Sequence, residues 1–266
     1  MLYGSSLIKF DNRPSLSVVT TGKLPKLLFI HGANCNNTIW LPLMKSLASE
    51  GIDSIALDLR GHGESHGREL LHTFTIFDYV SDVIEILNLT PTVSLVAGHS
   101  MGGLVSQLVA GQCDLSGLIL IASSPVAGMR PEGFRMALKH PVTFLAATLK
   151  RSYARLYQKE YVVRSLLFDT DSPQTMVQEF MRTVQEESWI AASQMIDVLP
   201  DPTKVSCEVL VIGGKNDFMV SAKAVKRTAI AYGTEPVLFD RAAHMVPVEV
   251  KPKVLARVIL DFLKPS

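Results

Sequence analysis

The chain has 266 residues, a hydrophobic fraction of 47% and a formal net charge of +1 at pH 7. This length and composition are typical of one large globular domain, or of a domain with an insertion, that buries a sizeable core. The small net charge excludes a strong overall field of the kind that attracts nucleic acid, so we expect no nucleic-acid partner.

The sequence contains no segment of secretory or membrane-spanning type. Residues 1–10 have no basic leader followed by an apolar stretch, and no run approaches the ~20 apolar residues of a transmembrane helix. The three cysteines, Cys35, Cys113 and Cys207, form neither a disulfide framework nor a metal-binding spacing. We therefore expect a cytoplasmic protein with no bound metal and no cofactor.

Seven short apolar runs, bounded by turn residues, predict β-strands. In chain order they cover residues 16–20, 26–30, 52–57, 93–97, 118–122, 209–212 and 236–239. Helical periodicity lies between several of these runs. The alternation predicts an α/β fold with a mostly parallel sheet and helices on both of its faces.

Two of the predicted helices carry clear signals. The first covers residues 75–87 and begins at Thr75, which forms a capping-box pattern with Asp78. Its apolar face is predicted from the spacing of Phe77, Val80, Ile84 and Leu87. The second covers residues 252–262, and its predicted sheet-facing residues are Val254, Leu255, Val258, Ile259 and Phe262.

A Gly-His-Ser-Met-Gly pentapeptide surrounds Ser100, between the predicted strand 93–97 and a helical pattern at 104–110. A G-x-S-x-G sequence in this context indicates a nucleophile elbow, a sharp turn that exposes the serine hydroxyl. The glycines are needed because side chains beside the strained serine would clash. The helix that follows directs backbone N–H groups and its positive dipole end towards the same place.

A serine needs an adjacent base, and candidates follow along the chain. Asp217 comes after the predicted strand 209–212, and His244 comes after the predicted strand 236–239. The order serine, aspartate, histidine is the order found in α/β-hydrolases. Two other acids compete with Asp217. Asp240 is too close to His244 in sequence to orient it, and Asp58 lies in a separate motif.

Two further motifs extend this pattern. His31, Gly32 and Ala33 follow the predicted strand 26–30, and residues 58–65 read D-x-R-G-x-G-x-S. With the elbow and its partners, these motifs make nearly the whole chain resemble the α/β-hydrolase superfamily. The resemblance implies a catalytic triad of Ser100, Asp217 and His244. It also implies an oxyanion hole formed by the backbone N–H groups of Ala33 and Met101.

The strand–helix alternation breaks between residue 124 and about residue 204. The resemblance implies that a helical cap is inserted here, over the nucleophile. We predict a core of residues 1–124 and 205–266 and a cap of residues 125–204; the alternative is an extension of the outer helix layer. Candidates to line an apolar cavity are Phe134, Met136, Phe144, Leu145, Phe168, Met176, Phe180, Met181, Trp189, Met195 and Ile196.

Basic residues and tyrosines each recur every four residues between positions 151 and 161. They are Arg151, Arg155 and Lys159 on one side and Tyr153, Tyr157 and Tyr161 on the other. On a helix this spacing predicts a basic face and an aromatic face. The basic face is either a solvated surface, a site for an anionic substrate group, or a weak peripheral contact with a membrane.

These observations predict a serine hydrolase of carboxylesterase, lysophospholipase or monoacylglycerol-lipase type. It would cleave a small-molecule carboxylic ester with a hydrophobic acyl or aryl part, through an acyl intermediate on Ser100. Three alternatives remain open on the same fold: a carbon–carbon bond hydrolase or thioesterase, a cofactor-free lyase, and a ligand sensor.

Overall fold

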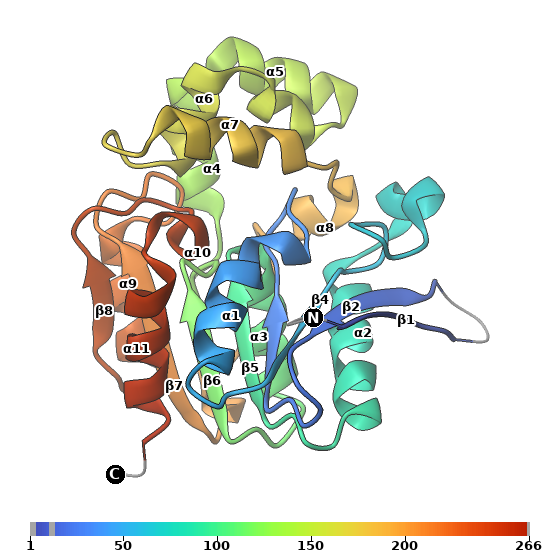
Figure 1. The fold of residues 1–266 in the computed structure, drawn as a ribbon. Coiled ribbons are helices and arrows are strands. Elements are labelled where there is room, and N and C mark those ends of the chain that lie inside the picture. Colours follow the sequence, from blue (N-terminus) through green and yellow to red (C-terminus); the bar gives the residue numbers. More distant parts are fainter. Residues whose placement is uncertain (1–3, 11–13, 265–266) are drawn as a thin grey trace.

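An eight-stranded sheet forms the centre of the molecule (Figure 1). The computed structural model describes residues 4–10 and 14–264; residues 1–3, 11–13 and 265–266, which the sequence assigns to the core, lie outside it. The strand order is β1-β2-β4-β3-β5-β6-β7-β8. The strands are β1 Gly4–Ile8, β2 Leu16–Thr20, β3 Leu27–Ile30, β4 Ser54–Leu57, β5 Leu95–His99, β6 Gly117–Ile121, β7 Glu208–Gly214 and β8 Pro236–Phe239.

The sheet is mostly parallel, as predicted. Strand β2 runs antiparallel to β1 and β4, and the remaining neighbours pair in parallel. All seven predicted strands are present, and their ends shift by a few residues at most. Strand β1 was missed because its side chains are mostly exposed and contain few apolar residues, so it lacks the signal of a buried strand.

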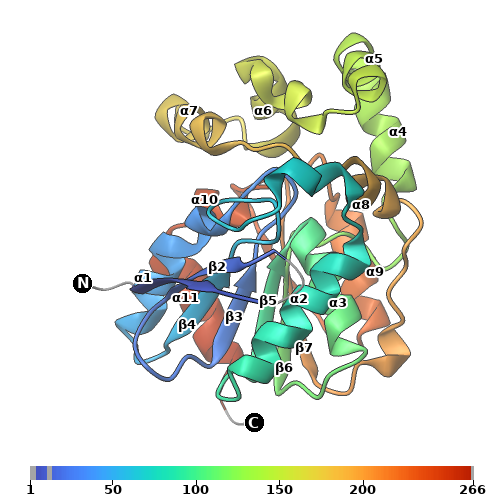
Figure 2. The same ribbon diagram turned by 90° about the vertical axis from the view of Figure 1, so that its right-hand side faces the viewer.

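Helices cover both faces of the sheet, which confirms the predicted fold class. The α-helices are α1 Leu41–Ala48, α2 Ile76–Leu89, α3 Met101–Ala110, α4 Arg130–Lys139, α5 Pro141–Lys150, α6 Glu160–Leu167, α7 Gln174–Thr183, α8 Trp189–Gln194, α9 Ala222–Ala231, α10 Val246–Glu249 and α11 Pro252–Phe262. The 3-10 helices are η1 Asn37–Trp40, η2 Arg68–Thr73, η3 Tyr153–Gln158 and η4 Pro202–Lys204. Helices α1 and α11 pack on one face, and α2, α3 and α9 pack on the other (Figure 2).

The helix predictions were right about ends and partly wrong about faces. Thr75 and Asp78 form the predicted capping box. The buried side of α2 contains Ile76, Tyr79, Val80, Val83 and Ile86, whereas Phe77 is 53% exposed. Helix α11 has the predicted bounds, but Val254 is 46% exposed and does not face the sheet. Apolar residues spaced three to four positions apart can define either of two neighbouring faces of a helix. Contact with the sheet decides which of these faces is buried.

The chain between β6 and β7 is helical, and α4 to α7 lie above the sheet (Figures 1 and 2). Helix α8 differs from them, because it packs against α2 and η2. The prediction of a continuous basic helix around residues 151–161 was wrong. Helix α5 ends at Lys150, Arg151 has a φ of 49°, and extended backbone at Lys159 separates η3 from α6.

Candidate active site

The turn at Ser100 joins β5 to α3 and has the strained backbone expected of an elbow. Ser100 has a φ of 52° and a ψ of −117°. A Cβ atom on Gly98 would lie 2.2 Å from the carbonyl oxygen of Gly102, and one on Gly102 would lie 2.3 Å from that of His31. Real side chains do not fit at such distances, so both positions need glycine. The sequence therefore holds the serine at the carboxyl end of the central strand β5.

The structure brings Ser100, His244 and Asp217 together. His244 Nε2 lies 2.9 Å from Ser100 Oγ, and His244 Nδ1 lies 2.9 Å from Asp217 Oδ2. The backbone N–H of Val220 donates to the other oxygen, Asp217 Oδ1, at 2.8 Å. The serine hydroxyl can thus donate to the imidazole while Nδ1–H donates to the carboxylate. This is the geometry of a nucleophile, a base and an orienting acid.

The two rival acids lie elsewhere. Asp240 is exposed and forms an ion pair with Lys215. Asp58 is buried and accepts backbone N–H groups from Asn37 at 2.7 Å and Glu64 at 3.1 Å, so it holds two loops together. Neither carboxylate contacts His244 among the described residues.

The loop His31–Ala33 closes over the nucleophile. A Cβ on Gly32 would lie 2.7 Å from His99 Nδ1 and 3.0 Å from the Cβ of Ser100, so glycine allows this close approach. Met101 is the first residue of α3, and Ala33 lines the cavity above Ser100. In the described chain, neither backbone N–H donates to a protein acceptor.

Two buried histidines support these loops instead of exchanging protons. His31 Nδ1–H donates to the Gly32 carbonyl at 2.8 Å, and His31 Nε2 accepts from the Leu59 N–H at 3.1 Å. His99 Nε2–H donates to the His244 carbonyl at 2.9 Å. Burial, reinforced by a neighbouring histidine, lowers the pKa of each ring to about 3. Both rings are therefore neutral at pH 7, and each holds a loop of the site by hydrogen bonds.

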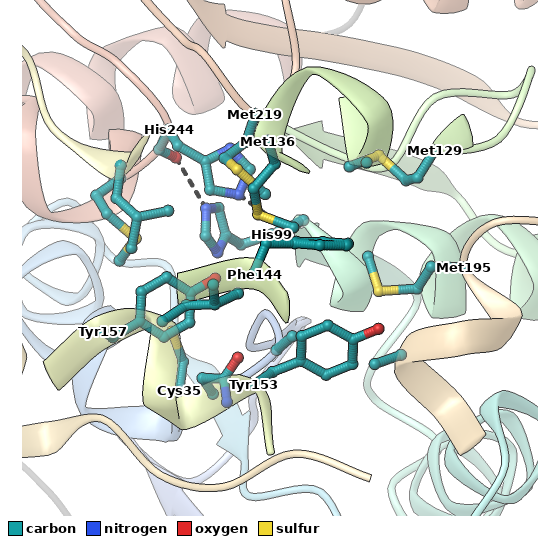
Figure 3. A pocket seen from close by; sticks show the side chains of 18 of the residues that line it. Cys35, His99, Met129, Met136, Phe144, Tyr153, Tyr157, Met195, Met219 and His244 are labelled. Atoms are coloured by element: carbon teal, nitrogen blue, oxygen red, sulfur yellow. Dashed lines mark hydrogen bonds between the residues drawn. The ribbon is translucent and has the colours of Figure 1, made fainter. Parts of the chain in front are cut away.

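A cavity of about 120 Å³ opens beside Ser100 and His244 (Figure 3). Its wall is mainly apolar and contains the methionines Met129, Met136, Met195, Met219 and Met245 together with Phe144, Leu156, Leu167, Phe180 and Ile196. Among the described residues, no Lys, Arg, Asp or Glu lines it. The cavity therefore favours an uncharged, apolar group next to the nucleophile.

About half of the predicted lining residues reach this cavity: Met136, Phe144, Phe180, Met195 and Ile196. Phe134 and Leu145 point outwards and are exposed, and Trp189 stacks on Tyr153 at 4.8 Å between ring centroids. The prediction missed Met219 and Met245, although each lies close in sequence to a triad residue. That adjacency was the signal that could have found them.

Residues 27–258 match the model of the alpha/beta hydrolase family, and the chain belongs to this family. The fold and the Ser–His–Asp arrangement are those of its serine hydrolases. The chain is similar to 2-(acetamidomethylene)succinate hydrolase of Mesorhizobium japonicum, with 25% identity over 259 residues that cover 94% of this chain and 92% of that protein. It is also similar to the human monoacylglycerol lipase ABHD6, with 24% identity over 91% of this chain and 76% of that protein.

Solved structures show the same fold. An esterase from Exiguobacterium antarcticum matches with a TM-score of 0.79 and 17% identity, over 98% of this chain and 100% of that chain. An esterase from Thermogutta terrifontis matches with a TM-score of 0.74 and 21% identity, over 98% of both chains. In the part of this chain that the structure describes, no group of His, Cys, Asp and Glu side chains is placed to hold a metal, and no helix is long and apolar enough to cross a membrane.

Proposed function

We propose that this protein is a serine hydrolase that cleaves carboxylic esters with a hydrophobic acyl or aryl part. One observation carries the proposal: the Ser100–His244–Asp217 array opens into a cavity whose described wall is apolar and free of charged side chains. Burying an unpaired charge against such a wall is costly, whereas an acyl chain or aryl ring gains contacts there. Flexible methionines suit groups of variable shape.

The reaction follows from the geometry. His244 accepts the proton of Ser100 as Oγ attacks the ester carbonyl carbon, and Asp217 stabilises the imidazolium. The backbone N–H groups of Ala33 and Met101 stabilise the oxyanion, where loss of one donor typically costs ~10²–10³ in turnover. His244 then gives the proton to the departing alcohol. A water molecule deprotonated by His244 hydrolyses the acyl-Ser100 ester and restores the enzyme.

The two named relatives point to different substrates, and the cavity discriminates between them. The Mesorhizobium relative is named for a succinate, whose carboxylates need cationic partners. ABHD6 is named for a monoacylglycerol, whose acyl chain needs an apolar wall. The lack of Lys and Arg among the described lining residues supports an ester of the second kind for this chain.

We further propose that residues 125–204 act as a cap on a core formed by residues 1–124 and 205–266. Helices α4 and α5 contribute Gly133, Met136 and Phe144 to the cavity wall, and η3 contributes Tyr153 and Tyr157. The triad and the proposed oxyanion groups all lie outside this segment. The cap would therefore select the acyl or aryl group while the core performs the chemistry.

The outer sides of α4 and α5 support the weak membrane contact as well. More than half of each of five large apolar side chains is exposed there: Phe134, Leu138, Val142, Leu145 and Leu149. Exposed cations, Lys150 and Arg151, follow at the end of α5. Apolar residues beside cations suit the surface of an anionic membrane. We propose a cytoplasmic protein that touches such a surface transiently to take up its substrate; its three cysteines are free, which suits that compartment.

Sedimentation with vesicles tests this contact. More wild-type protein should pellet with phosphatidylcholine vesicles that contain phosphatidylglycerol than with phosphatidylcholine alone. Leu145→Glu should reduce pelleting, whereas Ile230→Glu, at an exposed apolar position on α9, should not. Equal behaviour of the two variants would show that the α4–α5 surface is not the contact.

A substrate panel tests the hydrolase proposal directly. We expect p-nitrophenyl esters with medium acyl chains to be cleaved faster than acyl-CoA thioesters or β-diketones. Ser100→Ala should lose turnover and also lose covalent labelling by a fluorophosphonate probe. Labelling that persists in Ser100→Ala would place the nucleophile elsewhere. A preference for thioesters or diketones would contradict the proposed ester specificity and indicate a thioesterase or a carbon–carbon bond hydrolase.

A further inference from the structure

Residues 185–188, which we call the tie segment, connect the end of α7 to the start of α8 and contact the loop that carries Ala33. The side-chain amide of Asn34 donates to the Gln185 carbonyl at 2.8 Å, and the Gln185 N–H donates to the Asn34 carbonyl at 3.0 Å. The Gln185 side chain accepts the Gly63 N–H at 2.8 Å. The tie segment is thus bonded directly beside the proposed oxyanion donor.

Glu187 anchors the tie segment in the core. Its side chain is fully buried, and one carboxylate oxygen accepts the Tyr79 hydroxyl at 2.8 Å and the Ser188 N–H at 2.7 Å. The other oxygen lies 3.1 Å from Nε2 of His62, which is also fully buried. His62 Nδ1 faces the Arg60 carbonyl at 3.2 Å, and Nε2 lies within ion-pair distance of the carboxylate oxygen without the alignment of a hydrogen bond. A protonated His62 therefore pairs its charge with the Glu187 carboxylate.

The electrostatics agree with a buried ion pair. Burial by itself lowers the pKa of His62, but the Glu187 carboxylate, together with the Arg60 carbonyl and Asp58, outweighs it, and the pKa is raised overall. Burial by itself raises the pKa of Glu187, but His62, the Tyr79 hydroxyl and the Ser188 N–H outweigh it, and the pKa is lowered. A buried pair of this kind is costly to break, because removing one charge leaves the other unpaired.

A second route leads from this pair to the same loop. The ring centroid of His62 lies 5.1 Å from that of His31, and His31 holds the Gly32 carbonyl. The loop that carries Ala33 is therefore supported on one side through His62 and His31 and on the other through Gln185 and Asn34. The route through His62 ends at Glu187, and the route through Asn34 ends at Gln185, two residues before it in the tie segment.

We propose that Glu187 is a positioning residue, which holds the tie segment and His62 in place and thereby sets the position of the Ala33 N–H relative to Ser100. The inference rests on the oxyanion role proposed for Ala33. A displacement of about 1 Å in a reacting geometry can cost ~10²-fold in rate. Glu187 touches no reacting atom and acts only through the loop.

The neighbouring carboxylate provides a matched control. The Glu186 carboxylate accepts the Ser152 hydroxyl, the Ala154 N–H at 3.3 Å and the Glu187 backbone N–H at 3.3 Å, so it faces the start of η3 and the main chain. The side-chain oxygen of a glutamine can accept the same N–H and O–H groups. Glu186 lies in the same tie segment with the same charge, but it contacts neither His62 nor the loop of Ala33 among the described residues. Glu186→Gln should therefore leave the maximal rate unchanged within about twofold.

The test compares Glu187→Gln with Glu186→Gln in two assays. One is the rate constant for phosphonylation of Ser100 by a fluorophosphonate, which needs no knowledge of the substrate. The other is kcat and KM for p-nitrophenyl butyrate. We expect Glu187→Gln to lower both kcat and the labelling rate roughly 10- to 100-fold, with KM changed by about twofold or less. If Glu187→Gln melts earlier but reacts as fast as wild type well below its melting temperature, Glu187 is purely structural and the inference is wrong.

Two further variants keep the test decisive. Tyr79→Phe removes one donor to Glu187 and preserves the ring, so it should fold even if Glu187→Gln does not, and it should slow labelling severalfold. His62→Gln combined with Glu187→Gln should be no slower than Glu187→Gln alone, because the route through His62 depends on the His62–Glu187 contact that Glu187→Gln has already weakened. Additive effects would contradict the proposed route. If wild type labels at Ser100 but cleaves no ester, the ester proposal fails while the labelling comparison still tests Glu187.

Discussion

The elbow and the helices above it are built in different ways. At the elbow, Gly98 and Gly102 have backbone atoms within 2.3 Å of where a Cβ would lie. In α4, a Cβ on Gly133 would meet nothing within 4 Å, and the outer sides of α4 and α5 expose large apolar residues. Backbone contacts that admit only glycine thus hold the elbow around Ser100. The cavity wall, by contrast, consists of side chains that other apolar residues could replace. In the proposed function, this contrast would separate the chemistry from the choice of substrate.

The largest expected effect is in the triad. Asp217→Asn should keep the fold but favour the wrong imidazole tautomer of His244, and by analogy with other triads kcat should fall on the order of 10⁴-fold. Asp240→Asn should cost little, because Asp240 pairs only with Lys215 at the surface. Steady-state kinetics of both variants on one p-nitrophenyl ester measure this. A larger loss in Asp240→Asn would mean that the last two loops are arranged differently.

Replacing glycine by alanine should change the free energy of unfolding in opposite directions at the elbow and in α4. Gly98→Ala places a methyl group against the Gly102 backbone and should lower the free energy of unfolding by about 3 kcal/mol, with loss of activity. Gly133→Ala lies inside a helix with open space around it and should raise that free energy by ~0.5–1 kcal/mol. Denaturant unfolding of both variants checks this. A destabilised Gly133→Ala would show that α4 is as tightly packed as the elbow.

Acid should weaken the core more than the helices above it. His31 and His99 stay neutral in the folded chain down to their pKa of about 3, whereas in the unfolded chain each takes up a proton below about pH 6.5. Stability should therefore fall with decreasing pH between about 6 and 3, by ~3 kcal/mol per pH unit for the two rings together. Denaturant unfolding at pH 7, 6 and 5 measures this slope.

Histidine variants show whether the slope of stability against pH comes from the core or from the helices above it. His99→Gln should remove about half of this slope. His140→Gln should change it much less, because His140 lies between α4 and α5 and is only partly buried, so that burial and Lys139 lower its pKa less than the pKa of either core ring. His62 contributes with the opposite sign, since its raised pKa gives stability below its unfolded pKa that is lost as pH rises through the folded one. If the pH dependence of stability disappears in His140→Gln, the acid-sensitive group lies in the helices above the sheet and not in the core.

The smallest expected effect concerns substrate choice. Met136→Ala enlarges the cavity and should shift the ratio of kcat/KM for long over short acyl esters by roughly tenfold. Phe134→Ala, two residues away but 67% exposed, should leave this ratio unchanged. A series of p-nitrophenyl esters of increasing chain length measures both. Equal shifts would mean that the acyl group binds outside the cavity.

The sequence predicted those parts of the fold that depend on neighbouring residues. The capping box at Thr75 and the bounds of α11 depend on a few consecutive positions, and both were predicted. The exposed orientation of Phe77 and Val254 was not predicted. The helical spacing alone does not say which side of a helix contacts the sheet. The prediction of a basic helix at residues 151–161 failed because Arg151 is left-handed and Lys159 is extended, which leaves only a short 3-10 helix between α5 and α6.

By itself, the sequence determined the strand–turn–helix setting of Ser100 and the order in which Asp217 and His244 follow strands, since each signal is local. Only the tertiary structure decided which methionines line the cavity and that Glu187 meets His62 and Tyr79. Glu187 and Tyr79 lie 108 positions apart in the chain. No spacing rule links such residues, because their contact arises when the segment between α7 and α8 folds back onto the core.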